Sequence, residues 1–136
     1  MSSIFTKIIN KEIQAAIIYE DDLAIAFLDI SQATKGHTLV VPKQEAKTIL
    51  ELDLKYASHL LVVVKKVTKI IKERLKPSGF NLISNNGEIA GQSVPHFHIH
   101  IIPRYTKDDV KIETTNNSAN VTKTSLEVLR LLLKED

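Results

Sequence analysis

Three histidines at alternate positions of one short segment constrain this chain more than any other feature. The segment reads Pro95-His96-Phe97-His98-Ile99-His100-Ile101-Ile102. Because side chains alternate between the two faces of a β-strand, the pattern predicts a strand over 97–102, which Pro103 ends, with the three imidazoles on one face. Neighbouring imidazoles are then roughly 7 Å apart along the strand. The apolar face can enter a core, and the imidazole face must then border a polar cleft or find buried partners.

A cluster of this kind favours function over structure. Burying three imidazoles by chance is costly, because each buried polar group needs a partner. Two chemistries follow. Neutral imidazole is a common ligand of zinc and copper, which indicates a metal site. An imidazole nitrogen can also attack phosphorus and form a phosphoramidate, which divides one difficult displacement into two easier ones. The triad alone leaves both open.

The loop before the triad favours the phosphorus chemistry. It reads Asn85-Asn86-Gly87-Glu88-Ile89-Ala90-Gly91-Gln92-Ser93. Small residues expose backbone N–H groups to an anion, and Asn85, Gln92 and Ser93 add amide and hydroxyl donors. Donors suit phosphate oxygens and contribute little to a metal site. Neither a P-loop nor a dinucleotide-binding glycine pattern is found, so those modes of nucleotide binding are not supported.

Composition excludes several other classes of protein. The chain has 136 residues, a formal net charge of +2 and no cysteine. This length predicts one domain over residues 1–136. The charge excess is too small to bind nucleic acid through its phosphates alone, and no apolar run spans a membrane, so we expect neither partner. Disulfides and thiol chemistry are impossible. The first residues lack the apolar core of a secretory signal, and we expect a cytoplasmic protein.

Hydrophobic periodicity predicts an α+β fold of about five mostly antiparallel strands, with the helices on one face. Expected strands cover 17–19, 24–28, 38–41, 80–84 and 97–102. A short helix is expected over 4–9. A long helix begins after Asp53 as its N-cap and ends at Pro77 and Gly79, and we interpret its row of lysines as a solvated face. A tail helix is expected over about 118–134, capped by Asn117 or Ser118.

The segment 91–102 resembles the signature of the histidine triad superfamily, in which three histidines alternate with apolar residues. Three more blocks resemble the family in the same order, at 4–9, 26–30 and 36–43. The resemblance covers residues 3–105, the expected core. It implies an α+β meander that commonly forms a homodimer, partly through the long helix. Residues 101–104 are similar to the hydrolase-like and bacterial members.

The resemblance also implies a mechanism through a covalent nucleotidyl-histidine. His98 would attack the α-phosphate of a purine nucleoside 5′-phosphoramidate or dinucleoside polyphosphate and release the nucleoside monophosphate. His96 and His100 would set the tautomer of His98, and His37 would support the triad. Gln92 and Ser93 would contact the phosphate and the leaving group.

The remaining implied roles concern nucleotide binding. Asn85 and Gly91 would line the phosphate pocket, and Asp29 would hold the ribose hydroxyls. The slot for the purine base would be formed by Phe5, Ile8, Phe27 and Ile30. His59 matches no block of the family, and we expect it to be structural or exposed.

The sequence departs from the family at one known zinc site. Some members hold a structural zinc with two cysteines near the N-terminus, where this chain has Ser3 and Thr6, and a position that is often histidine is Glu45. These residues are poor zinc ligands. We therefore expect no structural zinc, no catalytic metal and no cofactor, and an N-terminal segment held by packing.

Two alternatives remain beside the nucleotide hydrolase. One is a nucleotide-binding sensor or interaction protein with incidental turnover, because a binding pocket and a slow active site use the same residues. The other, less favoured, is a metal-dependent hydrolase that uses the triad as ligands.

Overall fold

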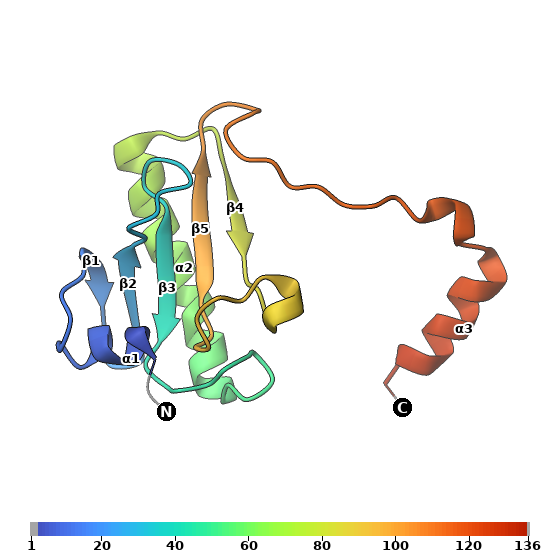
Figure 1. Cartoon of the computed structure of the whole chain (residues 1–136), viewed down its shortest axis with the longest axis horizontal. Helices are drawn as coiled ribbons and strands as arrows, with labels where there is room; N and C mark the ends of the chain where they lie inside the picture. Colours follow the sequence, from blue (N-terminus) through green and yellow to red (C-terminus); the bar gives the residue numbers. More distant parts are fainter. Residues whose placement is uncertain (1–2, 136) are drawn as a thin grey trace.

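The computed structural model describes residues 3–135, and a five-stranded sheet forms the centre of the molecule (Figure 1). The α+β fold is as predicted, and no helix of the described residues is long and apolar enough to span a membrane. The elements in chain order are α1 Ile4–Ile9, β1 Ile17–Glu20, β2 Ala24–Leu28, β3 Thr38–Pro42, α2 Leu54–Leu75, β4 Gly79–Ile83, the 3₁₀ turn η1 Glu88–Ala90, β5 Ile99–Arg104, the 3₁₀ turn η2 Ser118–Asn120 and α3 Lys123–Leu133.

The sheet has the strand order β1-β2-β3-β5-β4, and every neighbouring pair is antiparallel. The last strand of the chain is thus inserted between β3 and β4. In this register Leu39 of β3 pairs with His100 of β5, and Ile83 of β4 pairs with the same histidine from the other side. His100 therefore lies in the interior of the sheet, next to the start of β3.

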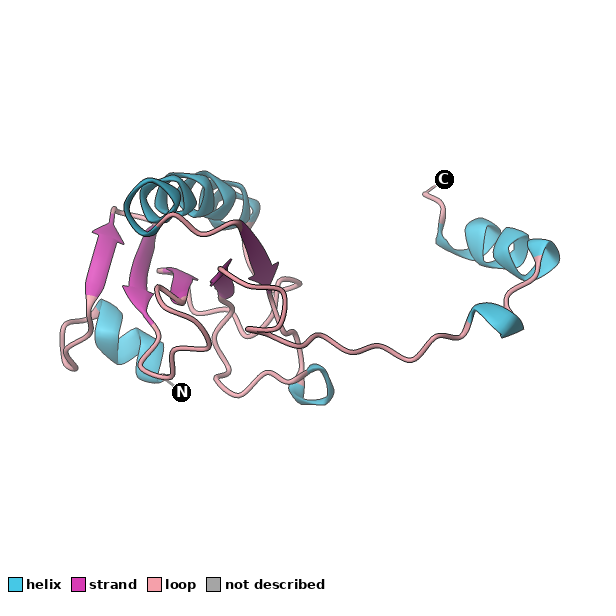
Figure 2. Cartoon of the chain, turned by 90° about the horizontal axis from the view of Figure 1, so that it is seen from above, coloured by secondary structure: helices cyan, strands magenta, loops and turns pink. Residues whose placement is uncertain are grey.

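Helices cover both faces of the sheet, which corrects the prediction that they share one face (Figure 2). One core joins Ala24, Ala26 and Val40 to the buried face of α2. The other joins Phe5 and Ile8 of α1 to the opposite side chains of the same strands, Ile25, Phe27, Leu39 and Val41. β2 and β3 are buried on both faces, so their sequences are continuous apolar runs without alternation.

The long helix ends before Pro77, as predicted, and its two cap residues are Asp53 and Lys76. Asp53 is the N-cap residue, as expected, although its side chain makes no capping hydrogen bond. At the other end neither Pro77 nor Gly79 provides the cap. Lys76 adopts the left-handed conformation with φ 57°, and its N–H donates to the Lys72 carbonyl. The Lys72 ammonium donates to the Pro77 carbonyl, which satisfies another free acceptor at this end.

The fifth strand covers Ile99–Arg104, not 97–102, so of the triad only His100 lies within a strand. The backbone before it is turned instead toward the loop after β3, and the Phe97 N–H donates to the Ala46 carbonyl over 2.7 Å. Pro103 does not end the strand. Its carbonyl accepts from the Thr34 hydroxyl, so its nitrogen lies on the side of β3 but beyond the first residue of that strand, Thr38, and no ladder hydrogen bond is lost.

The C-terminal residues leave the body as an extended arm (Figure 1). Residues 111–117 have no regular structure. The tail helix is shorter than expected, since Asn117 and Ser118 belong to the separate turn η2. Thr122 caps α3 instead, through a reciprocal pair of hydrogen bonds with Ser125. A side chain that can form such a capping box outcompetes an isolated Asn or Ser.

The strained cap at Lys76 yields a stability prediction. Lys76→Gly is expected to raise the free energy of unfolding by up to about 1 kcal/mol, because glycine adopts positive φ without a Cβ clash. Urea unfolding followed by circular dichroism measures the change. Lys65→Gly, at an exposed interior position of the same helix, is the matched control and is expected to cost about 1 kcal/mol. A loss of stability in both variants would contradict the assignment of the cap.

Candidate active site

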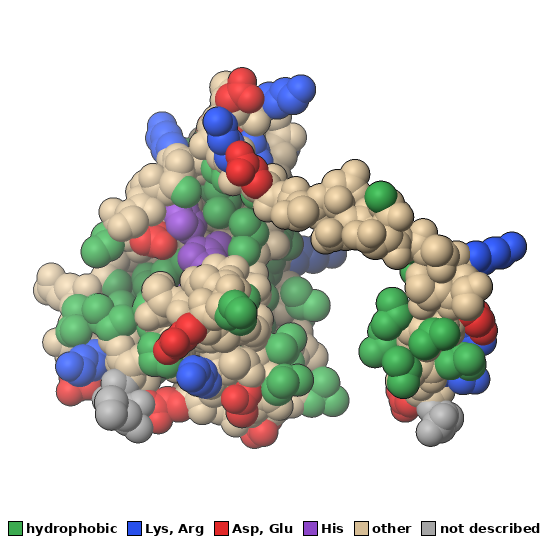
Figure 3. Space-filling view, turned by 45° about the vertical axis from the view of Figure 1, so that its right-hand side comes forward, with side chains coloured by type: hydrophobic (Ala, Val, Ile, Leu, Met, Phe, Trp, Pro, Cys, Tyr) green, Lys and Arg blue, Asp and Glu red, His purple; other side chains and the backbone are tan. Residues whose placement is uncertain are grey.

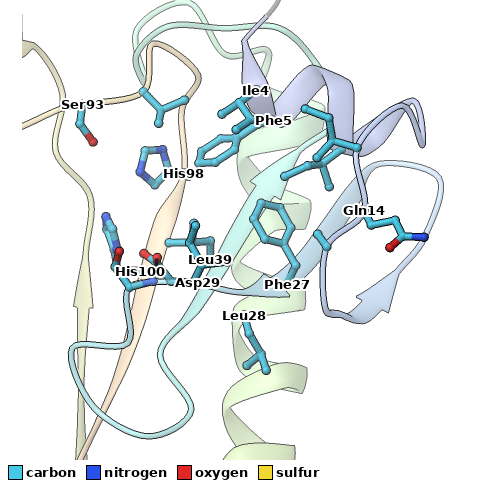
Figure 4. A pocket seen from close by; sticks show the side chains of 16 residues that line it. Ile4, Phe5, Gln14, Phe27, Leu28, Asp29, Leu39, Ser93, His98 and His100 are labelled. Carbon is cyan, nitrogen blue, oxygen red and sulfur yellow. Dashed lines mark hydrogen bonds between the residues drawn. The ribbon is translucent and has the colours of Figure 1, made fainter.

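A cavity of about 410 Å³ opens between α1, the end of β2 and the start of β5 (Figure 4). Eight of the predicted site residues line it: Phe5, Ile8, Phe27, Asp29, Ile30, Ser93, His98 and His100. The other five do not line it: His37, Asn85, Gly91, Gln92 and His96. The cavity thus brings together residues from both ends of the sequence core.

Half of the residues that line the cavity were not predicted from the sequence. Leu39 could have been found, because it alternates with Val40 on a recognised strand and pairs with His100. Val94 directly follows the predicted Ser93. No pattern marks the loop after α1, although its polar Gln14 is held at the wall of the cavity (Figure 4). The remaining members are Ile4, Ile13, Ala15, Leu28 and Ser31.

One half of the cavity is apolar and contains two phenylalanines. The Phe5 and Phe27 rings meet edge to face with their centroids 5.5 Å apart, and Phe5 also meets the His98 ring edge to face at 5.0 Å. Both phenylalanines are buried, whereas Ile30 is fully exposed and therefore forms the rim. Aromatic and aliphatic walls of this kind suit a flat, largely apolar ligand group.

The other half carries the polar groups. His98, His100 and Ser93 lie on the side of the cavity opposite Phe27, with Asp29 beside His100 (Figure 4). The His98 and His100 ring centroids are 4.9 Å apart, closer than the roughly 7 Å expected for alternate residues of a regular strand. The approach is possible because His98 precedes β5 and its backbone is not constrained by the ladder.

The partners of His98 determine which ring nitrogen carries its hydrogen. Its Nδ1 lies 2.7 Å from the His96 carbonyl oxygen. A carbonyl can only accept, so Nδ1 donates, and the neutral ring then has its lone pair on Nε2. The resemblance assigned this task to the imidazoles of His96 and His100, but in the structure the acceptor is the backbone of His96. The peptide geometry thus holds His98 in one tautomer.

The His96 ring is turned away from the cavity and is 1 % exposed. Its Nε2 donates to the Pro42 carbonyl over 2.9 Å, and its Nδ1 accepts from the Ser3 hydroxyl over 3.2 Å. Ser3 also accepts from the Thr6 N–H and so caps α1. Both ring nitrogens of His96 are therefore used to fasten the N-terminal segment to the end of β3.

The residues at the family's zinc position do not fit that metal. Ser3 and His96 share a hydrogen bond, and the Thr6 hydroxyl donates to the Glu45 carboxylate over 2.8 Å. Hydroxyls remain protonated near neutral pH and are weak zinc ligands. At this position hydrogen bonds made by Ser3 and Thr6 hold the N-terminal segment, in addition to the packing that was predicted to hold it.

His37 supports His100 from behind the cavity. Its Nδ1 accepts from the Ala33 N–H, so its Nε2 carries the hydrogen and donates to Nδ1 of His100 over 2.9 Å. His100 consequently carries its own hydrogen on Nε2. The Asp29 carboxylate lies 3.6 Å from the same His37 nitrogen. A chain of fixed donors therefore runs from the backbone at Ala33 to the cavity.

Asp29, His37 and His100 form the one group of metal-ligating side chains found in residues 3–135, with their ligand atoms within 4.8 Å of one another. The tautomer of His37 opposes metal binding there. Its Nε2 bears a hydrogen, and transferring that hydrogen to Nδ1 would set two N–H groups against each other at Ala33. The geometry therefore favours a hydrogen-bonded relay over a metal site.

Burial keeps the triad neutral. It lowers the pKa of both His96 and His98, and it lowers the pKa of His100 to about 4, with the nearby His98 and His37 adding to the effect. Near pH 7 the three rings are thus uncharged, and His98 offers a free lone pair.

His59 lies elsewhere, on α2, where its Nε2 contacts the Asp21 carboxylate at 2.6 Å, in agreement with the structural role predicted for it.

Gln92 shapes the loop before the triad. Its amide oxygen accepts from the Gly87 N–H, and its amide nitrogen donates to the Lys47 and Val94 carbonyls. These bonds occupy both the amide oxygen and the amide nitrogen of Gln92, the side chain that was predicted to contact the phosphate. Gly91 has φ 91°, and a Cβ at this position would lie in van der Waals contact with the Asn85 side chain. Only Ser93 of this loop reaches the main cavity, and it also lines a smaller one of about 80 Å³ with Lys47, Glu88, Gln92 and Pro95.

The hydrogen-bond partners predict observable tautomers. Long-range proton–nitrogen NMR correlations are expected to show His98 as the Nδ1–H form and His37 and His96 as Nε2–H forms. His96, His98 and His100 are each expected to titrate below pH 6.5, because burial disfavours their charged forms. An Nε2–H form of His98, or a titration midpoint of His98 above pH 6.5, would contradict the site geometry.

Comparisons with known proteins agree with this geometry. The family model described as "HIT domain" matches residues 10–107. The "Protein hit" of Bacillus subtilis is 50% identical over 106 residues, which cover 78% of this chain and 73% of that protein. The "Adenosine 5'-monophosphoramidase hnt1" of Schizosaccharomyces pombe is 45% identical over 104 residues, which cover 76% of this chain and 74% of that one.

Two solved structures extend the likeness to the whole chain. A HIT family protein from Bacillus anthracis superposes with a TM-score of 0.91 at 45% identity and covers 96% of this chain and 93% of its own. A HIT family member from Bacillus subtilis superposes with a TM-score of 0.92 at 39% identity and covers 100% of both chains. With its triad, its sheet and its matching sequence, this chain belongs to the histidine triad family.

Proposed function

We propose that this protein is a metal-independent nucleotide hydrolase that acts at the α-phosphate of purine nucleoside 5′-phosphoramidates through a nucleotidyl-His98 intermediate. The observation that carries the proposal is the hydrogen bond from His98 Nδ1 to the His96 carbonyl. It leaves the Nε2 lone pair of a neutral imidazole in a cavity that also holds Ser93 and His100. A nucleophile fixed in one tautomer beside hydrogen-bond donors is what attack on phosphorus requires.

The two halves of the cavity correspond to the two halves of a nucleotide. The purine base would enter the apolar half between Phe5, Phe27 and the exposed Ile30, and Asp29 would accept from the ribose hydroxyls. The α-phosphate would then reach the polar half at His98. There the Ser93 hydroxyl and the Nε2–H of His100 are available as donors to its oxygens.

The reaction proceeds in two displacements at phosphorus. The His98 Nε2 lone pair attacks the α-phosphate, a P–N bond forms, and the bond to the leaving amine breaks with its electrons going to the amine, which takes a proton from solvent. The modified ring is cationic, and the His96 carbonyl stabilises it by accepting from Nδ1. Water then attacks phosphorus and loses a proton to solvent, a P–O bond forms, and the P–Nε2 bond breaks with its electrons returning to Nε2, which releases the nucleoside monophosphate and leaves His98 neutral again.

The charge of the lining favours an amine over a phosphate chain as the leaving group. No lysine or arginine is among the described residues that line the main cavity, and the small cavity on the other side of Ser93 sets Glu88 against Lys47. A polyphosphate would bring several negative charges with few cations to meet them. The name of the Schizosaccharomyces pombe relative, an adenosine 5′-monophosphoramidase, supports the same substrate class.

The first test compares histidine variants in the presence of EDTA. Release of AMP from adenosine 5′-phosphoramidate is expected for wild type and should fall at least about 1000-fold in His98→Asn, because the nucleophile is lost. His59→Asn, which changes a histidine outside the cavity, is the matched control and should retain activity. A full rate in His98→Asn would refute the mechanism, and tight AMP binding without turnover in wild type would favour a nucleotide sensor.

The pH dependence of kcat/KM tests the protonation state. Attack needs neutral His98, so the rate is lost as pH falls through the His98 pKa, which burial holds below its ordinary value of 6.5. The acid limb should therefore have its midpoint below pH 6.5. A midpoint at or above 6.5 would show that His98 is not shielded as the structure indicates.

A further inference from the structure

Gln14 brings a polar side chain to the apolar half of the main cavity. Among the described lining residues that precede Asp29 in the chain, all the others are apolar. Figure 4 shows Gln14 at the end of the view opposite His98, with the rings of Phe5 and Phe27 between them. A ligand that fills the cavity from His98 past the two phenylalanine rings therefore ends near Gln14.

The loop that carries Gln14 is held by backbone hydrogen bonds on both sides. On the side of α1, the Glu12 N–H donates to the Lys7 carbonyl over 2.8 Å. On the side of the sheet, the Ala16 carbonyl accepts from the Leu28 N–H over 3.0 Å. The backbone at Gln14 therefore has a defined place, and its side chain starts from a fixed point at the cavity wall.

A strained turn directs this loop along the cavity. Lys11 has φ 64°, a backbone conformation that residues other than glycine rarely adopt. Its N–H donates to the Ile8 carbonyl over 3.1 Å, and its ammonium pairs with the Glu20 carboxylate of β1 at 2.5 Å. After this turn residues 13–15 line the cavity. Strain that is held in place by contacts on two sides is typical of segments that position a ligand.

The amide of Gln14 is available to a ligand. The side chain is exposed, and no hydrogen bond joins its amide to another of the described residues. Gln32 and Gln92 differ in this respect, because the amide oxygen and the amide nitrogen of each are both bonded within the protein. At the edge of an apolar slot, the Gln14 amide can replace the hydrogen bonds to water that a ligand's polar edge would lose on entry.

The direction of a bound nucleotide determines which of its atoms would meet this amide. With the α-phosphate at His98 and the ribose at Asp29, the base points away from both, and the purine atoms farthest from the ribose are N1 and the substituent on C6. Adenine carries a donor on C6 and an acceptor at N1, whereas guanine carries an acceptor on C6 and a donor at N1. The surface around the cavity, with the histidines in purple, is visible in Figure 3.

Building on the proposed nucleotide hydrolase, on which this step rests, we propose that Gln14 binds the outer edge of the purine base and lets the site accept adenine and guanine nucleotides alike. A primary amide holds a donor and an acceptor side by side, and half a turn about its Cγ–Cδ bond exchanges them. One orientation matches adenine, and the other matches guanine. A pyrimidine is one ring shorter, so its polar edge does not reach Gln14 and it binds more weakly.

Calorimetric titration of the full chain with AMP, GMP and CMP tests the proposal. Wild type is expected to bind AMP and GMP with Kd values within about 5-fold of each other, and CMP more weakly than either. In Gln14→Glu the carboxylate accepts from guanine N1–H but faces the adenine N1 lone pair, so the ratio of the AMP Kd to the GMP Kd should rise at least about 10-fold. Asn10→Asp is the matched control. It makes the same amide-to-carboxylate change at an exposed position at the end of α1, outside the cavity lining, and should leave the ratio unchanged.

A second titration removes one hydrogen bond from the ligand instead of the protein. Purine riboside 5′-monophosphate lacks the amine on C6, and wild type should bind it about 2- to 10-fold more weakly than AMP. In Gln14→Leu the two ligands should bind alike, because the partner of the amine is gone. A purely structural role of Gln14 would change both affinities by the same factor.

The outcomes separate this proposal from the proposed function. An AMP-to-GMP ratio that Gln14→Glu leaves unchanged, or a cost of losing the amine that persists in Gln14→Leu, refutes the role of Gln14 alone. A wild-type preference of more than about 10-fold for either purine refutes it too, since the amide would then bind one edge only. A wild type that binds none of these nucleotides refutes the nucleotide site, and the proposed function with it.

Discussion

The antiparallel pairing of β3 with β5 is the constraint on which the site depends. It joins segments 63 residues apart, because Leu39 lies opposite His100 and the adjacent His37 meets His100 through a 2.9 Å hydrogen bond. The insertion of β5 between β3 and β4 also places the turn before it against α1, where Phe5 contacts the His98 ring. A loss of this register would separate His100 from His37 and would move His98 away from Phe5, since both histidines are positioned by β5 and the turn before it.

Burial of the histidines is compatible with stability only because the backbone supplies their partners. Carbonyls at Pro42 and His96 accept from two rings, and the Ala33 N–H donates to a third. Each bond satisfies a buried polar atom and also selects a tautomer, so the same contacts serve folding and reactivity. Because backbone groups do not titrate, the arrangement keeps His98 neutral without a carboxylate in direct contact. The cavity in turn offers hydrogen-bond donors rather than cations, which suits a single phosphoryl group.

The apolar side chains of the molecule lie in two places, the body and the C-terminal arm. The body buries two cores, one on each face of the sheet, and is complete without the arm. In the arm, by contrast, helix α3 is mostly apolar and none of its residues is buried. The site and the arm are separate in space, so each can be altered without disturbing the packing of the other.

The sequence by itself determined the fold class, the family and the bounds of α1 and β2, because periodicity and residue type are local properties. Tertiary structure decided the rest. It placed α1 opposite α2, started β5 two residues later than alternation predicted, and gave the tautomer of His98 to a backbone carbonyl. It also withdrew Gln92 and His96 from the cavity and brought in Gln14. These features depend on which distant groups meet, and hydrogen-bond partners are chosen by register and packing, which no local pattern encodes.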